Sequence, residues 1–166
     1  MPARVFGAST IGVDARVIDV ETNFYNGVPK FFLVGLTDRA VIASNFRVEA
    51  AIRNTCGYFP RGRITVNLAP ADVPKEGSAF DLPIAVGLLM EAGQLSSFKL
   101  ESCMIVGELA LDGNLRPVKG VLPIAVEAQK LGFKNLLLPK ENGPEASVVE
   151  GLNVFGFGHL EEVRQW

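Results

Sequence analysis

The stretch Pro74–Pro83 (PKEGSAFDLP) holds a lysine, a serine and an aspartate around a glycine. It is typical of a turn from a strand into a helix, and such turns can bind anions because free backbone N–H groups and the helix dipole point at the ligand. Ser78 and Asp81 also have capping-box spacing. Because a helix beginning at Ser78 would press the Pro83 ring against the carbonyl of Ala79, we predict that Asp81 is the N-cap rather than a catalytic group.

The two cysteines and the single histidine could in principle form a nucleophilic pair or part of a metal site. Cys56 and Cys103 lie far apart, without a second cysteine or histidine at metal-ligand spacing, and a zinc site needs about four ligands. Cys56 falls in an apolar helical pattern and Cys103 opens an apolar run. A pairing of either with His159 is possible, but the pattern favours reduced core thiols in a cytosolic protein.

Nucleotide-binding motifs are absent from the sequence. The phosphate-binding pattern G-x-x-x-x-G-K-[ST] does not occur, and Gly156-Phe157-Gly158 supplies only the first half of G-x-G-x-x-G. Without the glycine loop and its lysine, the β- and γ-phosphates have no cradle. We therefore expect no cofactor in this chain.

Basic residues gather locally, and acidic ones are interleaved with them. The basic residues are Arg47, Arg53, Arg61, Arg63 and Lys75, with Arg116 and Lys119 further on, and the acidic ones are Glu49, Asp72 and Glu76. This mixture is typical of a solvated surface, and the absence of alternating aromatic residues weighs against a single-strand groove.

The elements that must position these residues begin with strands. Alternating or apolar β-prone runs predict strands over 3–8, 11–20, 30–36, 63–69, 135–138 and 153–157, that over 30–36 being buried. Segments 103–111 and 115–118 predict a hairpin around Asp112-Gly113-Asn114.

Helices are predicted between the strands. The first covers 39–56, with a cap at Thr37-Asp38, a stop at Gly57 and an apolar face of Ile42, Phe46, Ala50 and Ile52. The second, 82–92, is apolar nearly all round and should be buried. A third starts near Pro123 and ends at Gly132, a short one covers 144–150, and 161–166 begins a last one. We predict one α/β (α+β) domain over 1–166, a mixed sheet with packed helices.

The composition limits the class of protein to which this chain can belong. The 166 residues are 48% hydrophobic and 20% charged, which indicates a folded domain, and the net charge of −2 excludes a strongly basic nucleic-acid footprint. No apolar run approaches the ~18 residues that span a bilayer. The segment 1–10 does not resemble a signal peptide. We expect a cytoplasmic protein with no membrane partner.

Many separate blocks of the sequence resemble the N-terminal domain of the ComM/YifB family, bacterial magnesium-chelatase-like AAA+ ATPases. They are VFGASTIGVDARVIDVETNF, GVPKFFLVGL, RITVNLAPADVPKEG, FDLPIA, VGEL-x-LDG-x-LRPVKGVLPIA and LGF-x-NLLLP. The last three also look like the C-terminal Lon-type domain of the recombination protein RadA. The blocks fall in one order over nearly the whole chain, and the resemblance implies the fold of the Lon proteolytic domain.

Lon-type peptidases use a Ser–Lys dyad, in which an amine takes the serine proton. Aligned without gaps, the nucleophile position falls on Ala79, and a slip of one residue would place Ser78 there. The position of the dyad lysine falls on Ile124, and Lys119 stands five residues earlier. Isoleucine cannot accept a proton, so the resemblance implies a peptidase fold whose catalytic pair is lost.

The family resemblance implies a non-catalytic N-terminal accessory domain of a hexameric ATPase. That motor would promote DNA branch migration in recombination and natural transformation. An ATPase module using ATP and Mg²⁺ would then begin near Trp166. We expect the partners to be further copies of the chain and DNA, single-stranded, with Lys75, Arg116 and Lys119 as contacts.

Two alternatives stay open. One is a serine peptidase in which Ser78 is the nucleophile and Lys75 or Lys119 the base. The other is a free-standing module that binds another protein.

Overall fold

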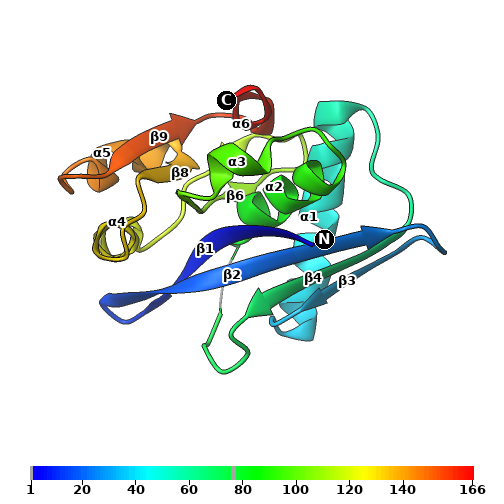
Figure 1. Cartoon of the computed structure of the whole chain (residues 1–166), viewed down its shortest axis with the longest axis horizontal. Coiled ribbons are helices and arrows are strands. Elements are labelled where there is room, and N and C mark those ends of the chain that lie inside the picture. The colour runs from blue at the N-terminus through cyan, green and yellow to red at the C-terminus, as the bar shows by residue number, and fades with distance from the viewer. Residues whose placement is uncertain (1, 76–77) are drawn as a thin grey trace.

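A mixed β-sheet organises the computed structural model, which describes residues 2–75 and 78–166 (Figure 1). Seven strands lie in the order β3-β4-β2-β1-β5-β8-β9. They are β1 (Ala3–Ile11), β2 (Asp14–Tyr25), β3 (Lys30–Val34), β4 (Arg63–Ala69), β5 (Cys103–Ile105), β8 (Asn135–Pro139) and β9 (Asn153–Phe157). A separate hairpin joins β6 (Glu108–Leu109) to β7 (Leu115–Arg116). The mixed sheet confirms the predicted fold class.

The two halves of the sheet differ in strand direction. β1 pairs antiparallel with β2, and β2 pairs antiparallel with β4, whereas β3 runs parallel to β4. On the other side, β1, β5, β8 and β9 are joined by parallel pairings. The parallel strands are connected through helices, as parallel pairing requires.

Helices cover the two faces of the sheet unequally. They are α1 (Asp38–Cys56), α2 (Asp81–Glu91), α3 (Ser97–Leu100), α4 (Val121–Lys130), α5 (Gly143–Ala146) and α6 (Leu160–Gln165), with a 3₁₀ turn, η1, at Lys140–Asn142. The larger core cluster holds residues of α1, α2 and α6, and the second cluster lies under α4 and α5. No helix in the described part of the chain is long and apolar enough to cross a membrane.

The prediction that the helix over 82–92 is buried is confirmed by α2. From Asp81 to Leu89 every residue is buried. At Gly87 the helix lies so close to β2 that a Cβ atom would stand 2.4 Å from Thr22 Oγ1. A glycine is therefore required for this approach of helix and strand.

Two predictions are wrong in part: the strand over 30–36 is not buried, and the buried face of α1 differs from the predicted one. β3 is an edge strand in which only Leu33 is buried, because β4 alone pairs with it. In α1, the cap at Thr37 and the stop at Gly57 are confirmed, and Ile52 of the predicted face is buried. Ile42 and Phe46, by contrast, are 59% and 70% exposed. The buried face of α1 instead contains Ser44, because the Ser44 hydroxyl donates to the buried Asp81 carboxylate of α2.

Further boundaries differ from the predictions. The segment 103–111 divides, because after β5 the chain leaves the sheet and bonds to the start of α2, with Gly107 N donating to Ala79 O and Leu82 N to Gly107 O. The short helix predicted over 144–150 is Gly143–Ala146. At the tail, α6 buries Leu160 and Val163, and the Trp166 ring lies against Phe155 and Phe157.

Candidate functional site

A cavity of about 340 Å³ lies where β1 ends, α2 begins and α4 begins. Its lining comes from four separate parts of the chain: Ala8, Ser9, Thr10, Ser78, Ala79, Glu108, Pro117, Val118, Lys119 and Ile124. We call it the Ser78–Lys119 cavity. The fold thus brings together the serine, the lysine and the isoleucine that the resemblance to Lon singled out.

The Ser78–Lys119 cavity does not hold a formed Ser–Lys pair. Within residues 2–75 and 78–166, no hydrogen bond joins the Ser78 hydroxyl to the Lys119 amine. Ile124, on the first turns of α4, is 1% exposed, so a buried alkyl side chain fills the position predicted for the base. An alkyl group cannot take the serine proton, and serine is a weak nucleophile without a base.

The loop that carries Lys119 is fixed from two sides. Val118 N donates to Asn142 Oδ1 and Asn142 Nδ2 donates to Val118 O, each at 2.9 Å. Gly120 follows with φ +76°, and a Cβ atom there would lie 2.6 Å from Thr10 Cγ2. The glycine therefore permits the close approach that positions Lys119 at the cavity. Asn142, which is buried, was not singled out from the sequence.

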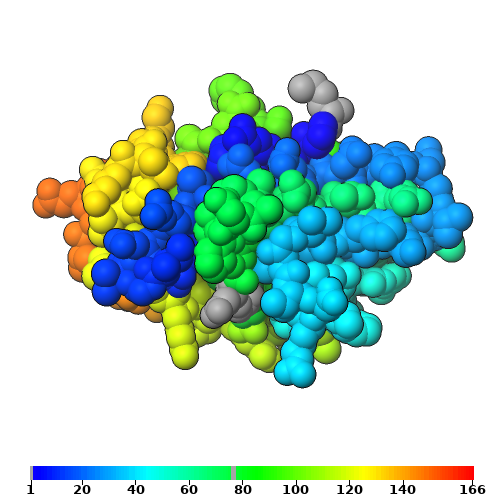
Figure 2. Space-filling model, turned by 90° about the horizontal axis from the view of Figure 1, so that it is seen from below, coloured from blue at the N-terminus to red at the C-terminus, as the bar shows by residue number. Residues whose placement is uncertain are grey.

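Lys75 occupies a different place from Arg116 and Lys119. It is only 7% exposed, and its Nζ donates to Pro70 O at 2.7 Å and to Val73 O at 2.9 Å. Figure 2 shows the loop before it, in green, between the β1–β2 hairpin and α1. The ammonium group closes this loop, so Lys75 is neither a free surface cation nor part of the cavity lining. Arg116 and Lys119 are exposed, and their contact role stays a prediction.

Asp81 is not the N-cap that the sequence analysis predicted. Phe80 stands at the cap position without a side-chain cap bond, and Asp81 is the first residue of α2. Its carboxylate is fully buried and turns toward α1 and β6 instead. Arg47 Nε donates to Oδ2 at 2.6 Å, Ser44 Oγ to Oδ1 at 2.9 Å and Leu109 N to Oδ2 at 3.1 Å. The side chain could not also cap α2.

Asp81 and Arg47 form the one ion pair with a buried member among the described residues. Burial raises the pKa of Asp81, while hydrogen bonds from Arg47, Leu109 N and Ser44 act against that rise. The hydrogen bond to Asp81 raises the pKa of Arg47. The pair joins α1, α2 and β6 beside the cavity. A signal for it was present, since Arg47 stood in the basic cluster while Asp81 opened a buried helix.

The cysteines and the histidine have structural surroundings. Cys103 is buried and Cys56 half-buried, and burial raises the pKa of both thiols, which disfavours the reactive thiolate. His159 Nδ1 accepts from Glu161 N at 3.0 Å, so His159 caps α6. In the described parts of the chain, no cluster of three His, Cys, Asp or Glu side chains could hold a metal ion.

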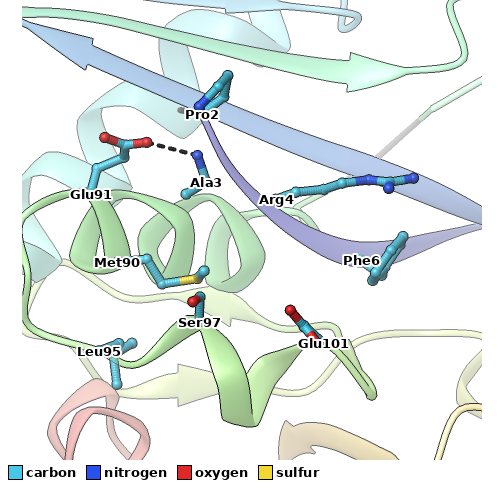
Figure 3. Close-up of a pocket in the computed structure, with 9 residues that line it drawn as sticks. All are labelled: Pro2, Ala3, Arg4, Phe6, Met90, Glu91, Leu95, Ser97 and Glu101. Atoms are coloured by element: carbon cyan, nitrogen blue, oxygen red, sulfur yellow. Dashed lines mark hydrogen bonds between the residues drawn. The ribbon is translucent and has the colours of Figure 1, made fainter.

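A cavity of about 660 Å³ lies between the start of β1 and the α2–α3 segment (Figure 3). Two of its charged groups are already used: Glu91 Oε1 accepts from Ala3 N at 2.7 Å, and Arg4 donates to Asp19 at 2.6 Å. The close-up shows Arg4 pointing away from Glu91. Size alone therefore does not mark this cavity as a functional site.

Comparison with known proteins agrees with the resemblance. A family model described as "Subunit ChlI of Mg-chelatase" matches residues 20–142. The chain is 43% identical over 164 residues to "Competence protein ComM" of Haemophilus influenzae, covering 99% of this chain and 32% of that protein. It is 42% identical over 161 residues to "Uncharacterized protein YifB" of Salmonella typhimurium, covering 97% and 32%.

A more distant similarity reaches the Lon proteases. The chain is 28% identical over 152 residues to "Lon protease homolog 2, peroxisomal" of Caenorhabditis elegans, covering 87% of this chain and 19% of that protein. The chain spans about a third of the length of the ComM and YifB relatives it matches. With identities above 40% over nearly all its residues and a matching ChlI family model, the chain belongs to the magnesium-chelatase-like ComM/YifB family.

Proposed function

We propose that this chain is a non-catalytic N-terminal accessory domain of a ring-forming, DNA-acting ATPase of the ComM kind. The observation that carries the proposal is the buried Ile124 side chain at the position of the Lon-type base. A fold related to a peptidase that lacks the base can still serve as a scaffold, since function depends on the site and not on the fold. The name of the Haemophilus influenzae relative, a competence protein, supports a role in DNA uptake and recombination.

The proposal assigns the energy-dependent steps to another part of the parent protein. ATP and Mg²⁺ would bind in an ATPase module, since this chain has no phosphate-binding glycine loop. The parent protein would be a cytoplasmic hexamer with helicase activity that promotes branch migration of single-stranded DNA. In that ring, the present domain would assist assembly of the hexamer and guide the DNA strand.

Arg116 and Lys119 are the proposed contacts on this domain. Both are exposed, and they lie close together on β7 and on the loop before α4. Exposed cations bind phosphate groups, and the slope of the affinity against salt concentration is proportional to the number of these contacts. Lys75 contributes differently, because its ammonium group holds the preceding loop together.

The first test is to sequence the gene beyond the codon for Trp166. The proposal expects a G-x-x-x-x-G-K-[ST] motif downstream. A stop codon at that point would contradict the motor assignment and favour a free-standing binding module.

The second test uses the parent protein with Arg116→Ala and Lys119→Ala. Loss of two phosphate contacts should weaken single-strand binding and reduce the salt slope by about 1.4, at about 0.7 per contact. An Arg39→Ala/Lys134→Ala variant, which removes two other exposed cations, is the matched control. Equal binding by wild type and the Arg116/Lys119 variant would rule out these contacts.

One observation favours the peptidase alternative: Ser78 and Lys119 line the same cavity. A working pair would need the Lys119 amine to reach the Ser78 hydroxyl, which requires a different conformation of the loop fixed by Asn142. That alternative predicts cleavage activity which disappears in Ser78→Ala.

A further inference from the structure

The sheet has an open face over β2, β4 and β3. Side chains alternate along each strand, and residues paired in register point to the same side. Phe24, Ile64 and Phe31 form one such row and belong to the helix-covered core or pack against it. The rows between them face the other way, where α4 packs on β1 and on the first part of β2, beside Ala8, Ala15 and Val17. Figure 1 shows α1 behind these strands and no helix in front of them.

Two rows of the open face combine cations with aromatic rings. Tyr25, Arg63 and Lys30 lie side by side across the three strands, and Asn23, Thr65 and Phe32 form the next row. Lys30 Nζ stands 4.9 Å from the centroid of the Phe32 ring, and Arg63 Cζ stands 5.1 Å from it. Tyr25 is 47% exposed. We call Tyr25, Lys30, Phe32 and Arg63 the basic–aromatic face.

The positive charge of this face is unmatched within the fold. Lys30 and Arg63 are direct cross-strand neighbours, and like charges in that arrangement destabilise a sheet. In the described residues, neither they nor Arg61 forms a salt bridge. The first carboxylate further along β2 on this face is that of Glu21, which accepts from Asn67. An unfavourable pair of cations kept in a chain of net charge −2 indicates an anionic ligand.

A groove continues this surface around the sheet edge. It has a volume of about 300 Å³ and is lined by Lys30, Arg61 and the ion pair of Arg53 with Glu49, among others. Phe31 and Phe59 stack in its wall, with ring centroids 6.0 Å apart. Figure 2 shows the strands beside it as adjacent bands, blue for β2, green for β4 and lighter blue for β3. The groove offers a path on which an extended polyanion could leave the face.

We propose that the basic–aromatic face binds single-stranded nucleic acid, with phosphates on Lys30, Arg61 and Arg63 and bases stacked on Tyr25 and Phe32. An exposed ring, Tyr25, and a half-buried one, Phe32, among cations suit unpaired bases, because every base offers a π-face and each phosphate a charge. A duplex would hide its bases from the rings, and an acidic peptide would leave the rings unused. This inference rests on the proposed DNA-related function but assigns a surface distinct from Arg116 and Lys119.

The charge test measures fluorescence anisotropy of a labelled oligothymidylate of about 12 nucleotides with this chain, over a range of salt concentrations. The variant Lys30→Gln/Arg63→Gln should bind at least about tenfold more weakly, with a salt slope smaller by about 1.4. The control Arg39→Gln/Lys134→Gln removes the same charge from exposed positions elsewhere. Equal losses in the two variants would overturn the assignment, as would a wild-type chain that does not bind.

The stacking test replaces rings with leucine. Tyr25→Leu and Phe32→Leu should each weaken binding about fivefold or more without changing the salt slope. Phe98→Leu is the control, because Phe98 is an 85% exposed ring on α3. Tyr25 is exposed, so its variant keeps the test valid even if Phe32→Leu perturbs the fold. Unchanged binding in Tyr25→Leu, or full displacement by oligoglutamate but not by unlabelled oligothymidylate, would contradict a nucleic-acid ligand.

The two proposals fail separately. If a P-loop follows Trp166 but the oligothymidylate does not bind this chain, the accessory role stands and the basic–aromatic face is wrong. If the oligothymidylate binds through Tyr25 and Arg63 but a stop codon follows Trp166, the assignment of the basic–aromatic face is supported and the motor assignment fails.

Discussion

The Ser78–Lys119 cavity and the basic–aromatic face use charged residues in opposite ways. In the cavity, Lys119 and Glu108 line a pocket whose inner wall is the buried Ile124, and Asp81 next to it is bound by Arg47. On the face, Lys30 and Arg63 lie opposite each other with no salt bridge in the described chain. The buried Asp81 beside the cavity is compensated by Arg47 inside the fold, whereas Lys30 and Arg63 on the face have no carboxylate partner in the described chain.

The difference separates what the resemblance to Lon implies for the cavity from what the surface chemistry of the face offers. The cavity gathers the residues that the resemblance to Lon singled out, yet the position expected for the base holds the alkyl side chain of Ile124. The sequence showed Arg61 and Arg63 only as part of a mixed, solvated surface, yet the face has the properties of a binding surface. A comparison of stability and binding in variants of the two regions can therefore break this account.

The largest effect is expected from Asp81→Ala. Removing the carboxylate leaves Arg47 half-buried without its partner and the Leu109 N–H unsatisfied. Loss of one member of a buried ion pair costs about 3–5 kcal/mol of the free energy of unfolding. Urea unfolding at pH 7 measures it. A loss below about 1 kcal/mol would show that the pair does not organise this region.

The pH dependence of the same site has a defined sign. Because burial raises the pKa of Asp81 in the folded chain, the folded state holds this proton more readily than the unfolded state does. The contribution of the carboxyl group to stability is therefore largest below the ordinary aspartate pKa and falls as pH rises through the folded value. The stability of wild type relative to Asp81→Asn should fall over that window. A relative gain would mean that Arg47 outweighs burial.

Ile124→Lys comes next in size. A lysine placed at the predicted base position would be buried in an apolar cluster, where the charged form is disfavoured. We expect a loss of about 3 kcal/mol or more at pH 7, with less loss at higher pH, where the amine is neutral. Val126→Lys, two residues along α4 at a partly exposed position, is the control and should cost far less. Equal stability of both variants would mean that the cavity still accepts the dyad lysine.

Lys30→Gln/Arg63→Gln should change stability little. The variant loses two contacts with the Phe32 ring but also removes a cross-strand repulsion. We expect unfolding within about 0.5 kcal/mol of wild type, measured by urea titration. A loss as large as that of Asp81→Ala would make these cations structural and remove the contrast with the cavity.

The smallest effect is expected from Glu161→Gln in α6. The hydrogen bond from Arg164 lowers the pKa of Glu161, so its contribution to stability is present above the ordinary glutamate pKa and is lost as pH falls through the lowered value. Glu161→Gln should be slightly less stable than wild type at pH 7, and the difference should shrink at a pH below the ordinary glutamate pKa. Thermal unfolding at the two pH values measures this. A constant difference would contradict the ion pair as its cause.

Local patterns predicted much of the fold. Alternation placed β1, β2 and β4, the Thr37 cap and Gly57 bounded α1, and the apolar run of α2 indicated burial. The edge position of β3 could not be predicted, because an apolar strand has the same sequence pattern at the edge of a sheet as in its centre. Its position depends on which strands pair with it. The inward face of α1 was missed since a buried serine and arginine were not recognised as partners of Asp81.

The site was predictable where residues are close in sequence or fixed by the family resemblance. Ser78, Ile124 and Lys119 were named from the sequence and do line one cavity. The basic–aromatic face was not predicted, because its residues come from three strands that only the register brings into rows. Alternation along one segment could not reveal a pattern that runs across strands.

The most direct test of the central claim, that the Ser78–Lys119 cavity is not a working peptidase site, is labelling by a fluorophosphonate probe. Wild type and Ser78→Ala are incubated with the probe, and the labelled fraction is read by mass spectrometry of the intact chain. Since Ser78 has no base, we predict the same background labelling in both. Stoichiometric labelling of the wild type that disappears in Ser78→Ala would contradict the account and make this chain a serine hydrolase.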